Sequence, residues 1–317
     1  GGAQSALGSS LHDVEIGNEP DLYFYFLTFI PPVDGVPTTY PAYKTEWNAY
    51  EAAIKTADPG VSFAGPDFYL TDWLPDLTRK TEVGLSEMTQ HFYPLADCGG
   101  SVVTPEQLLS PSSITSEDSL IKVAGKAAKR GHLPLVIDEF NSISCGSSSP
   151  AAYEFDSSLW AVHALLEAAA KGVSSVDLEM DPDNCNSYTP LCVPDPSAPA
   201  TLQPEPIFYA MQLVSSLEGG TFLGTRISHL PAGVAAYAVR LADGNVDVVV
   251  DNTTASDVTN LDLQLDATAQ LVSTQQLTAP SITSTDGVAL TTSTPSPSSP
   301  TGLSVPAGSA EVFTLTP

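Results

Sequence analysis

The fold is decided by the stretch Val14-Glu15-Ile16-Gly17-Asn18-Glu19-Pro20-Asp21. Apolar residues alternate in the sequence up to Ile16, which predicts a short buried strand, and the residues from Gly17 onward predict a sharp turn at its carboxyl end. Glu19 therefore stands at a strand tip. In α/β proteins the loops at that end of the sheet are where ligands bind.

A second acidic strand end follows 120 positions later (139 − 19). The segment 133–141, Leu-Pro-Leu-Val-Ile-Asp-Glu-Phe-Asn, is an apolar run that ends on Glu139 and opens into a Ser/Gly-rich loop. Asp138 alternates with Glu139, so we expect its side chain to point away from the site and to be structural. Either glutamate alone could cap a strand and pair with a cation. Two in the same setting favour a catalytic pair.

Length and charge narrow the class of protein. With 317 residues, 42% of them hydrophobic, the chain can form one large domain and a smaller one. A formal net charge of −26, with only 11 Lys plus Arg, argues against nucleic acid and anionic membrane surfaces as partners. No run reaches the length of a transmembrane span, and the first residues lack the features of a signal peptide and look internal.

The cysteines show no C-x-x-C spacing, so disulfides are favoured over a zinc site, and no metal or cofactor is indicated. Four cysteines allow three pairings; the pairing expected to be least strained joins nearby loops, Cys185 with Cys192 and Cys98 with Cys145. The sequon at Asn252 predicts N-glycosylation. Together with the disulfides it favours a secreted, extracellular protein.

Strands are expected near residues 12, 61, 89, 135 and 175, and helices over 43–57, 73–80, 116–131, 153–171 and 207–217. From residue 219 the helical period disappears and short alternating runs follow, with a hairpin turn at Asp243-Gly244. We therefore expect a catalytic α/β domain over 1–218 and a β-sandwich over 219–317.

Five parallel strands cannot close a barrel that needs eight. Either the sheet is open, or three strand–helix units precede Gly1; the second alternative explains more. The strand before Glu19 is then the fourth and that of Glu139 the seventh, so both acids come to one mouth. The predicted fold is the later part, strands 4 to 8, of a (β/α)8 barrel followed by a β-sandwich.

At this point the residues resemble a known group. Asn-Glu-Pro after an apolar strand, a glutamate ending a later strand, His91 and Tyr93 on the strand between, and a trailing sandwich are similar to clan A retaining glycoside hydrolases. Within that clan, E-I-G-N-E-P-D and V-I-D-E-F-N-S most resemble glycoside hydrolase family 79, the β-glucuronidase and heparanase-like enzymes. The resemblance covers essentially the whole chain and implies a companion N-terminal fragment that completes the barrel.

The resemblance implies that Glu19 is the general acid/base and Glu139 the nucleophile. Asn18 would then bond the sugar 2-hydroxyl. A retaining mechanism needs two carboxyl groups about 5 to 5.5 Å apart, one that attacks the anomeric carbon and one that protonates the leaving group.

Other candidates contact the substrate or the nucleophile. Tyr93 is expected to donate its hydroxyl to Glu139, with His91 as the second candidate for that role. The resemblance places a uronic-acid carboxylate near Ser187 and Tyr188. The alternative is that these four residues have no role in binding or catalysis and only pack at a strand end or in a loop.

The expected activity is exo-hydrolysis of terminal β-D-glucuronosyl groups, including 4-O-methylated ones, from glycosides or polysaccharides. Highly sulfated chains would be repelled by the net charge of −26. The alternatives are a clan A glycosidase of other sugar specificity, an endo-acting heparanase-like enzyme, and a non-catalytic carbohydrate-binding protein.

Overall fold

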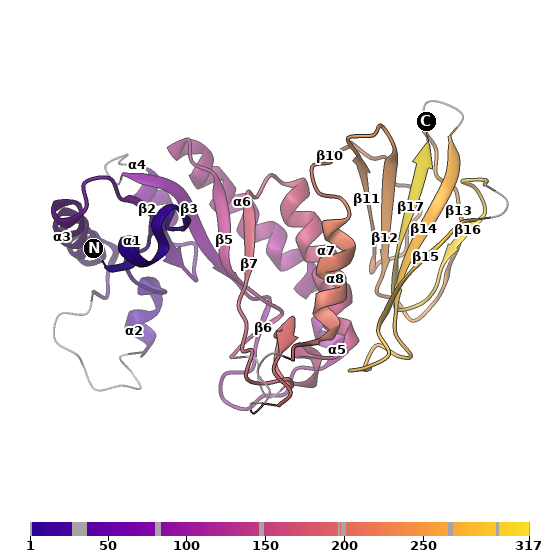
Figure 1. Ribbon diagram of the computed structural model, residues 1–317, viewed down its shortest axis with the longest axis horizontal. Helices are drawn as coiled ribbons and strands as arrows, with labels where there is room; N and C mark the ends of the chain where they lie inside the picture. The colour runs from indigo at the N-terminus through magenta and orange to yellow at the C-terminus, as the bar shows by residue number, and fades with distance from the viewer. Residues whose placement is uncertain are drawn as a thin grey trace. The chain divides into compact units, whose positions relative to one another are not determined.

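The computed structural model describes residues 2–26, 37–79, 84–145, 149–195, 197, 201–265, 269–295 and 298–316. They form two compact units (Figure 1). The first comprises Gly1–Phe92, Asp118–Phe140 and Lys171–Leu178; the second comprises Tyr93–Glu117, Asn141–Ala170 and Glu179–Pro317. A functional boundary between residues 218 and 219 stays a prediction.

The first unit is built on a five-stranded parallel sheet, at the five positions expected from the sequence. Its order is β1 (Asp13–Val14), β2 (Ser62–Phe68), β3 (Leu85–Phe92), β5 (Leu135–Phe140) and β7 (Ser175–Leu178). β1 is shorter than the predicted strand, because the chain turns out of the sheet after Val14. Among the described residues β1 and β7 each pair with one strand only, so the sheet is an open half-barrel.

Helices connect these strands as parallel crossovers require. They are α3 (Tyr40–Ala57), α4 (Leu74–Arg79) and α6 (Pro111–Gly131), preceded by α1 (Gly2–Leu7), η1 (Gly8–Ser10), η2 (Pro20–Leu22) and α2 (Tyr23–Phe26). α6 begins at Pro111 rather than at the predicted Ser116, and proline suits the first turn because its missing N–H would have no helical partner there. The expected end of α4 at Lys80 lies outside the described residues.

Aromatic side chains make the core between α3 and the sheet. Tyr43 and Trp47 of α3 pack edge-to-face on Phe68 and Phe63 of β2, with ring centroids 5.5 and 6.2 Å apart. All four side chains are at most 4% exposed. Burying a side chain of this size contributes about 1.5–3 kcal/mol, so this cluster fixes β2 and, with it, the loop at its carboxyl end.

The second unit contains an antiparallel β structure, as predicted from residue 219 onward. A six-stranded sheet runs β10 (Thr221–Phe222), β11 (Val234–Arg240), β12 (Val246–Asn252), β17 (Ser309–Thr316), β14 (Gln270–Thr278) and β15 (Ala289–Ser293). A second sheet pairs β13 (Val258–Leu261) with β16 (Leu303–Val305). The predicted hairpin is present between β11 and β12. Val250 and Phe313 belong to the buried core to which both sheets contribute.

Helices and short strand pairs complete the second unit. They are α5 (Pro105–Leu108), η3 (Pro150–Ala152), α7 (Phe155–Ala170), α8 (Pro206–Ser215), and the pairs β4 (Leu95–Ala96) with β6 (Ile143–Ser144) and β8 (Leu191–Cys192) with β9 (Gln203–Pro204). α7 is buried along most of its length and contacts α8 and β12.

Two disulfides lie in the second unit, Cys98–Cys145 and Cys185–Cys192, and they confirm the expected pairing. Among the described residues, no helix combines the length and the apolar character needed to cross a bilayer.

The predicted glycosylation at Asn252 does not agree with the fold. The Asn252 side chain is 0% exposed at the end of β12. Its amide nitrogen donates to the carbonyls of Ser256 (2.9 Å), Val305 (3.2 Å) and Pro306 (2.9 Å). An amide that is buried and fully engaged has no room for a glycan. In this fold the sequon is a structural clamp between β12 and the segment after β16.

Candidate active site

Glu19 lies on a loop whose backbone leaves the sheet abruptly. Gly17 has φ of 107° and Glu19 has φ of 46°, both in the left-handed region. A side chain at such a φ costs of order 1 kcal/mol or more and persists where the surroundings hold it. Here the Glu19 N–H donates to the Asp67 carbonyl at 2.9 Å, which ties the loop after β1 to the end of β2.

Asp21 provides a second tie between the same loop and β2. Its carboxylate is buried and accepts from the backbone N–H groups of Tyr69 (3.2 Å) and Leu70 (2.6 Å). Burial raises the pKa of Asp21 to about 6, the N–H groups oppose this, and the charge of Glu19 adds to the increase. The loop that carries Glu19 is therefore anchored on both sides of that residue.

His91, near the end of β3, is the centre of the site. It is 1% exposed. Its Nδ1 lies 3.0 Å from Glu19 Oε1 and 3.3 Å from Glu139 Oε2, and its Nε2 contacts Asp67 Oδ1. Burial alone would lower the pKa of His91, but the hydrogen bonds to Asp67 and Glu19 outweigh burial and raise it to about 11. The ring is an imidazolium at neutral pH and donates from both nitrogens.

The two strand-tip glutamates meet on this histidine. One carboxylate oxygen of Glu19, one of Glu139 and a ring nitrogen of His91 all lie within 4.8 Å of one another. The side chains of Glu19 and Glu139 keep 14% and 25% of their surface exposed, whereas His91 keeps 2%. Two accessible carboxyl groups thus share one buried cation beneath them.

Asp67 is a member of the site that was not expected from the sequence. Proline normally ends a strand, but β2 continues past Pro66 to Phe68. Asp67 adopts a left-handed φ of 62° and its N–H donates to Thr89 Oγ1 at 3.0 Å. The signal available in the sequence was an acid directly after a buried strand, the same pattern that identified Glu19.

Asp138 contradicts the expectation that it points away and is only structural. One of its carboxylate oxygens lies within 4.8 Å of atoms of Asp67 and His91. The pairing of β5 shifts register on both sides, between Thr89 and His91 on β3 and between Ile137 and Phe140 toward β7. Such irregularities re-aim side chains next to active sites, so the strict alternation of a regular strand does not hold here.

The same side chains carry donor atoms that metal ions use. Glu19, His91 and Glu139 form one group of potential ligands, and Asp67, His91 and Asp138 another. In the structure His91 contacts carboxylates through both ring nitrogens.

The remaining predicted residues have these positions. Asn18 is exposed, and its backbone N–H donates to Tyr23 Oη at 3.4 Å. Tyr93 follows β3 directly and is 9% exposed, and its contact with Glu139 stays a prediction. In the second unit Ser187 is buried, Tyr188 is partly exposed, and Asn141 holds their loop by donating to the Tyr188 carbonyl at 2.9 Å. Their contact with a sugar carboxylate also stays a prediction.

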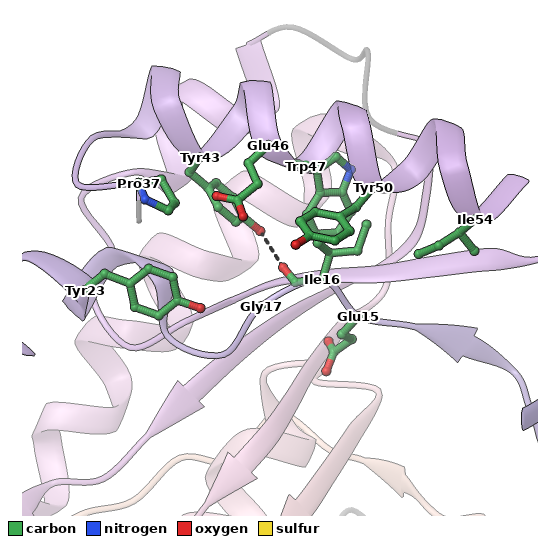
Figure 2. Close-up of a pocket in the computed structure, with 10 residues that line it drawn as sticks. All are labelled: Glu15, Ile16, Gly17, Tyr23, Pro37, Tyr43, Glu46, Trp47, Tyr50 and Ile54. Atoms are coloured by element: carbon green, nitrogen blue, oxygen red, sulfur yellow. Dashed lines mark hydrogen bonds between the residues drawn. The ribbon is translucent and has the colours of Figure 1, made fainter. Parts of the chain in front are cut away.

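A cavity of about 320 Å³ lies between α3 and the residues that follow β1 (Figure 2). Tyr43, Trp47 and Tyr50 line it from α3, and Tyr43 Oη donates to the Ile16 carbonyl at 3.4 Å. In Figure 2 the Glu15 carboxylate is turned away from these α3 side chains.

No protein-family model matches the chain, and no curated protein matches it in sequence. Solved structures do match. A 4-O-α-L-rhamnosyl-β-D-glucuronidase from Fusarium oxysporum 12S, in complex with Rha-GlcA, has a TM-score of 0.70 at 19% identity, over 96% of this chain and 70% of that one. An α-L-arabinofuranosidase from Thermotoga maritima, in complex with arabinose, has a TM-score of 0.65 at 17% identity, over 95% and 65%.

A third match is CelM2, a bifunctional glucanase-xylanase from a metagenome library, with a TM-score of 0.63 at 19% identity, over 99% of this chain and 68% of that one. The chain thus spans between 65% and 70% of the length of these three proteins. At such identities the likeness concerns the fold. The chain shares with these glycoside hydrolases a parallel half-barrel sheet and an antiparallel β structure.

Proposed function

We propose that this chain is the catalytic part of a retaining glycoside hydrolase, with Glu139 as nucleophile and Glu19 as general acid/base. One observation carries the proposal: carboxylate oxygens of the two glutamates lie within 4.8 Å of each other on the same His91 nitrogen. Retaining enzymes hold their two carboxyl groups about 5–5.5 Å apart, whereas inverting enzymes leave about 6.5–9.5 Å for a water molecule.

In this proposal each step uses one named carboxylate oxygen, chosen from the contacts of His91. His91 engages Glu19 through Oε1, so the proton for the leaving oxygen is carried on Glu19 Oε2. His91 engages Glu139 through Oε2, so attack on the anomeric carbon falls to Glu139 Oε1. The Oε1–carbon bond forms as the glycosidic bond breaks. Glu19, now ionised, lies beside the imidazolium and then takes a proton from the water that releases the sugar.

The preferred substrate is a terminal β-D-glucuronosyl group, with or without a 4-O-methyl group. The motifs E-I-G-N-E-P-D and V-I-D-E-F-N-S support this choice, and so does the fold shared with a glucuronidase that was solved with Rha-GlcA. In this proposal Asn18 bonds the 2-hydroxyl, Tyr93 donates to Glu139, and Ser187 and Tyr188 bind the uronic carboxylate. Neutral donors suit a chain with 11 basic residues.

We also propose that a companion segment supplies further strand–helix units to the site. The open edge of β1 among the described residues supports this proposal, because an unpaired edge strand in a parallel sheet leaves backbone N–H and C=O groups without partners. The disulfides are compatible with a secreted enzyme.

The test is turnover by the complete protein of aryl β-glucuronide, aryl β-glucoside, aryl β-xyloside and aryl α-L-arabinofuranoside, with Glu139→Gln as control. Glucuronide turnover that Glu139→Gln abolishes supports the proposal. Preference for another glycoside keeps the mechanism and replaces the substrate. Binding of glucuronides without turnover of any glycoside would identify a carbohydrate-binding protein instead.

A further inference from the structure

Asn141, directly after β5, is a buried side chain that the mechanism above does not use. It follows Glu139 by two positions and is 0% exposed. Its amide nitrogen donates to the carbonyls of Glu179 (2.8 Å) and Tyr188 (2.9 Å), and its Oδ1 accepts from the N–H of Ser142 (2.8 Å). Both hydrogens of the amide therefore have an acceptor.

These bonds continue the connection between two strands beyond their last paired residues. Phe140 of β5 pairs with Leu178 of β7, and the next residues of the chain are Asn141 and Glu179. There the Asn141 side chain takes over from the backbone ladder by donating to the Glu179 carbonyl. The same amide also holds the carbonyl of Tyr188, 47 positions away, so it joins two points of the loop that follows β7.

An amide is the side chain that suits this position. A carboxylate has the same shape, but it would turn an oxygen toward two carbonyl oxygens and could donate to neither when ionised. An apolar side chain would leave both carbonyls without this donor, and an unmade hydrogen bond at a buried position is costly. Asn141→Asp is therefore a sharp change, because it alters the donors and leaves the shape almost unchanged.

Other contacts hold the same loop independently of Asn141. A disulfide closes residues 185–192, and the Val193 N–H donates to the Pro182 carbonyl at 2.8 Å. Loss of the Asn141 donors should therefore release the backbone around Tyr188 while the rest of the loop stays fastened.

We propose that Asn141 is a positioning residue that sets the preference for a glucuronide by fixing the backbone at Tyr188. The inference rests on the proposed function, in which Tyr188 binds the uronic carboxylate. A misplacement of about 1 Å can cost about 100-fold in an enzyme reaction. A glucoside has a CH2OH group in place of that carboxylate, so its turnover should depend little on Asn141.

The experiment compares Asn141→Asp with Asn252→Asp in the complete protein. Asn252 is the matched control, because it is also 0% exposed and its amide also donates to backbone carbonyls, but in the β structure. The quantity measured is the ratio of kcat/KM for aryl β-glucuronide to kcat/KM for aryl β-glucoside. In Asn141→Asp this ratio should fall about 10- to 100-fold, mainly through KM for the glucuronide, as expected for a lost hydrogen bond to a charged group. In Asn252→Asp it should stay within about twofold of wild type.

Two further readouts separate positioning from a merely structural role. Hydrogen exchange of the backbone amides over residues 179–193 should be about fivefold faster or more in Asn141→Asp and unchanged in Asn252→Asp. Adding Asn141→Asp to Tyr188→Phe should lower the ratio no further than Tyr188→Phe does alone, because both changes remove the same contact. Asn141→Ser, which is uncharged and too short to reach both carbonyls, gives the same readouts if Asn141→Asp does not fold.

Three outcomes would overturn the inference: an unchanged ratio in Asn141→Asp, losses that add to those of Tyr188→Phe, or unchanged exchange over residues 179–193. The proposed function fails by a different result, the absence of turnover on every glycoside. The exchange measurement does not depend on turnover, so it still decides whether Asn141 holds the loop.

Discussion

The replacement His91→Gln tests whether one buried cation holds the site together. His91 keeps its proton up to about pH 11 in the folded protein, against an ordinary value of 6.5. At pH 7 that difference corresponds to about 5 kcal/mol of stability. Removing one partner of a buried ion pair costs about 3–5 kcal/mol, because the other charge is left uncompensated. We therefore expect His91→Gln to lower the free energy of unfolding by about 3–5 kcal/mol at pH 7.

The pH dependence of this effect has a definite sign. Because the folded-state pKa is raised, the contribution of His91 is complete below pH 6.5 and is lost as the pH rises toward 11. The difference between wild type and His91→Gln should shrink by about 2–3 kcal/mol between pH 7 and pH 9. Urea unfolding at both pH values measures it, with the exposed His12→Gln as control, which should stay within about 0.5 kcal/mol of wild type. A constant difference across that range would refute a charged His91.

Four more expectations can be measured on the same protein. Glu19→Gln should lower turnover by about 10²–10⁴-fold on substrates with poor leaving groups and less on activated aryl glycosides, and rate assays with both kinds of substrate measure the difference. Burial raises the pKa of Asp251, so the stability that this residue contributes is present at low pH and is lost as the pH rises. Asp251→Asn should therefore raise the free energy of unfolding by about 1–3 kcal/mol at pH 8, as measured by urea unfolding. Replacing Cys98 and Cys145 by serine should lower the free energy of unfolding by about 4 kcal/mol. Replacing Cys185 and Cys192, which close a shorter loop, should lower it by about 2.5 kcal/mol, and thermal unfolding measures both changes. Protein from a glycosylating host should keep its intact mass after endoglycosidase treatment, since folded Asn252 carries no accessible amide; a mass loss that disappears in Asn252→Gln would contradict the clamp.

The proximity of Glu19 and Glu139 could be predicted from the sequence because it depends on a simple regularity. Parallel strands end at the same edge of a sheet, so acids that end two apolar strands are brought to one place. Glu19 and Glu139 follow that regularity. The order of the five strands and the change to antiparallel pairing after residue 219 follow from periodicity in the same way.

His91 was a candidate from the sequence, but the two acids beneath it, Asp67 and Asp138, could not be predicted, since their positions depend on departures from regular structure. Asp67 sits beyond a proline that normally ends a strand, at a left-handed φ. Asp138 lies near His91 on β5, a strand whose register shifts on both sides. The burial of Asn252 likewise depends on carbonyls some 50 positions away. Local sequence patterns contain no information on such long-range contacts.

The clamp at Asn252 sets a competition during biosynthesis. Its side chain can be reached by an oligosaccharyltransferase only while β12 is still unfolded, before the carbonyls of Val305 and Pro306 close around the amide. A sugar attached in that interval would block insertion of the side chain and leave the sheet unfinished. A bacterial cytoplasm lacks this transferase, so protein made there is not glycosylated at Asn252. The same compartment is reducing and does not form the Cys98–Cys145 disulfide. Expression in a compartment that forms disulfides but does not glycosylate meets both requirements.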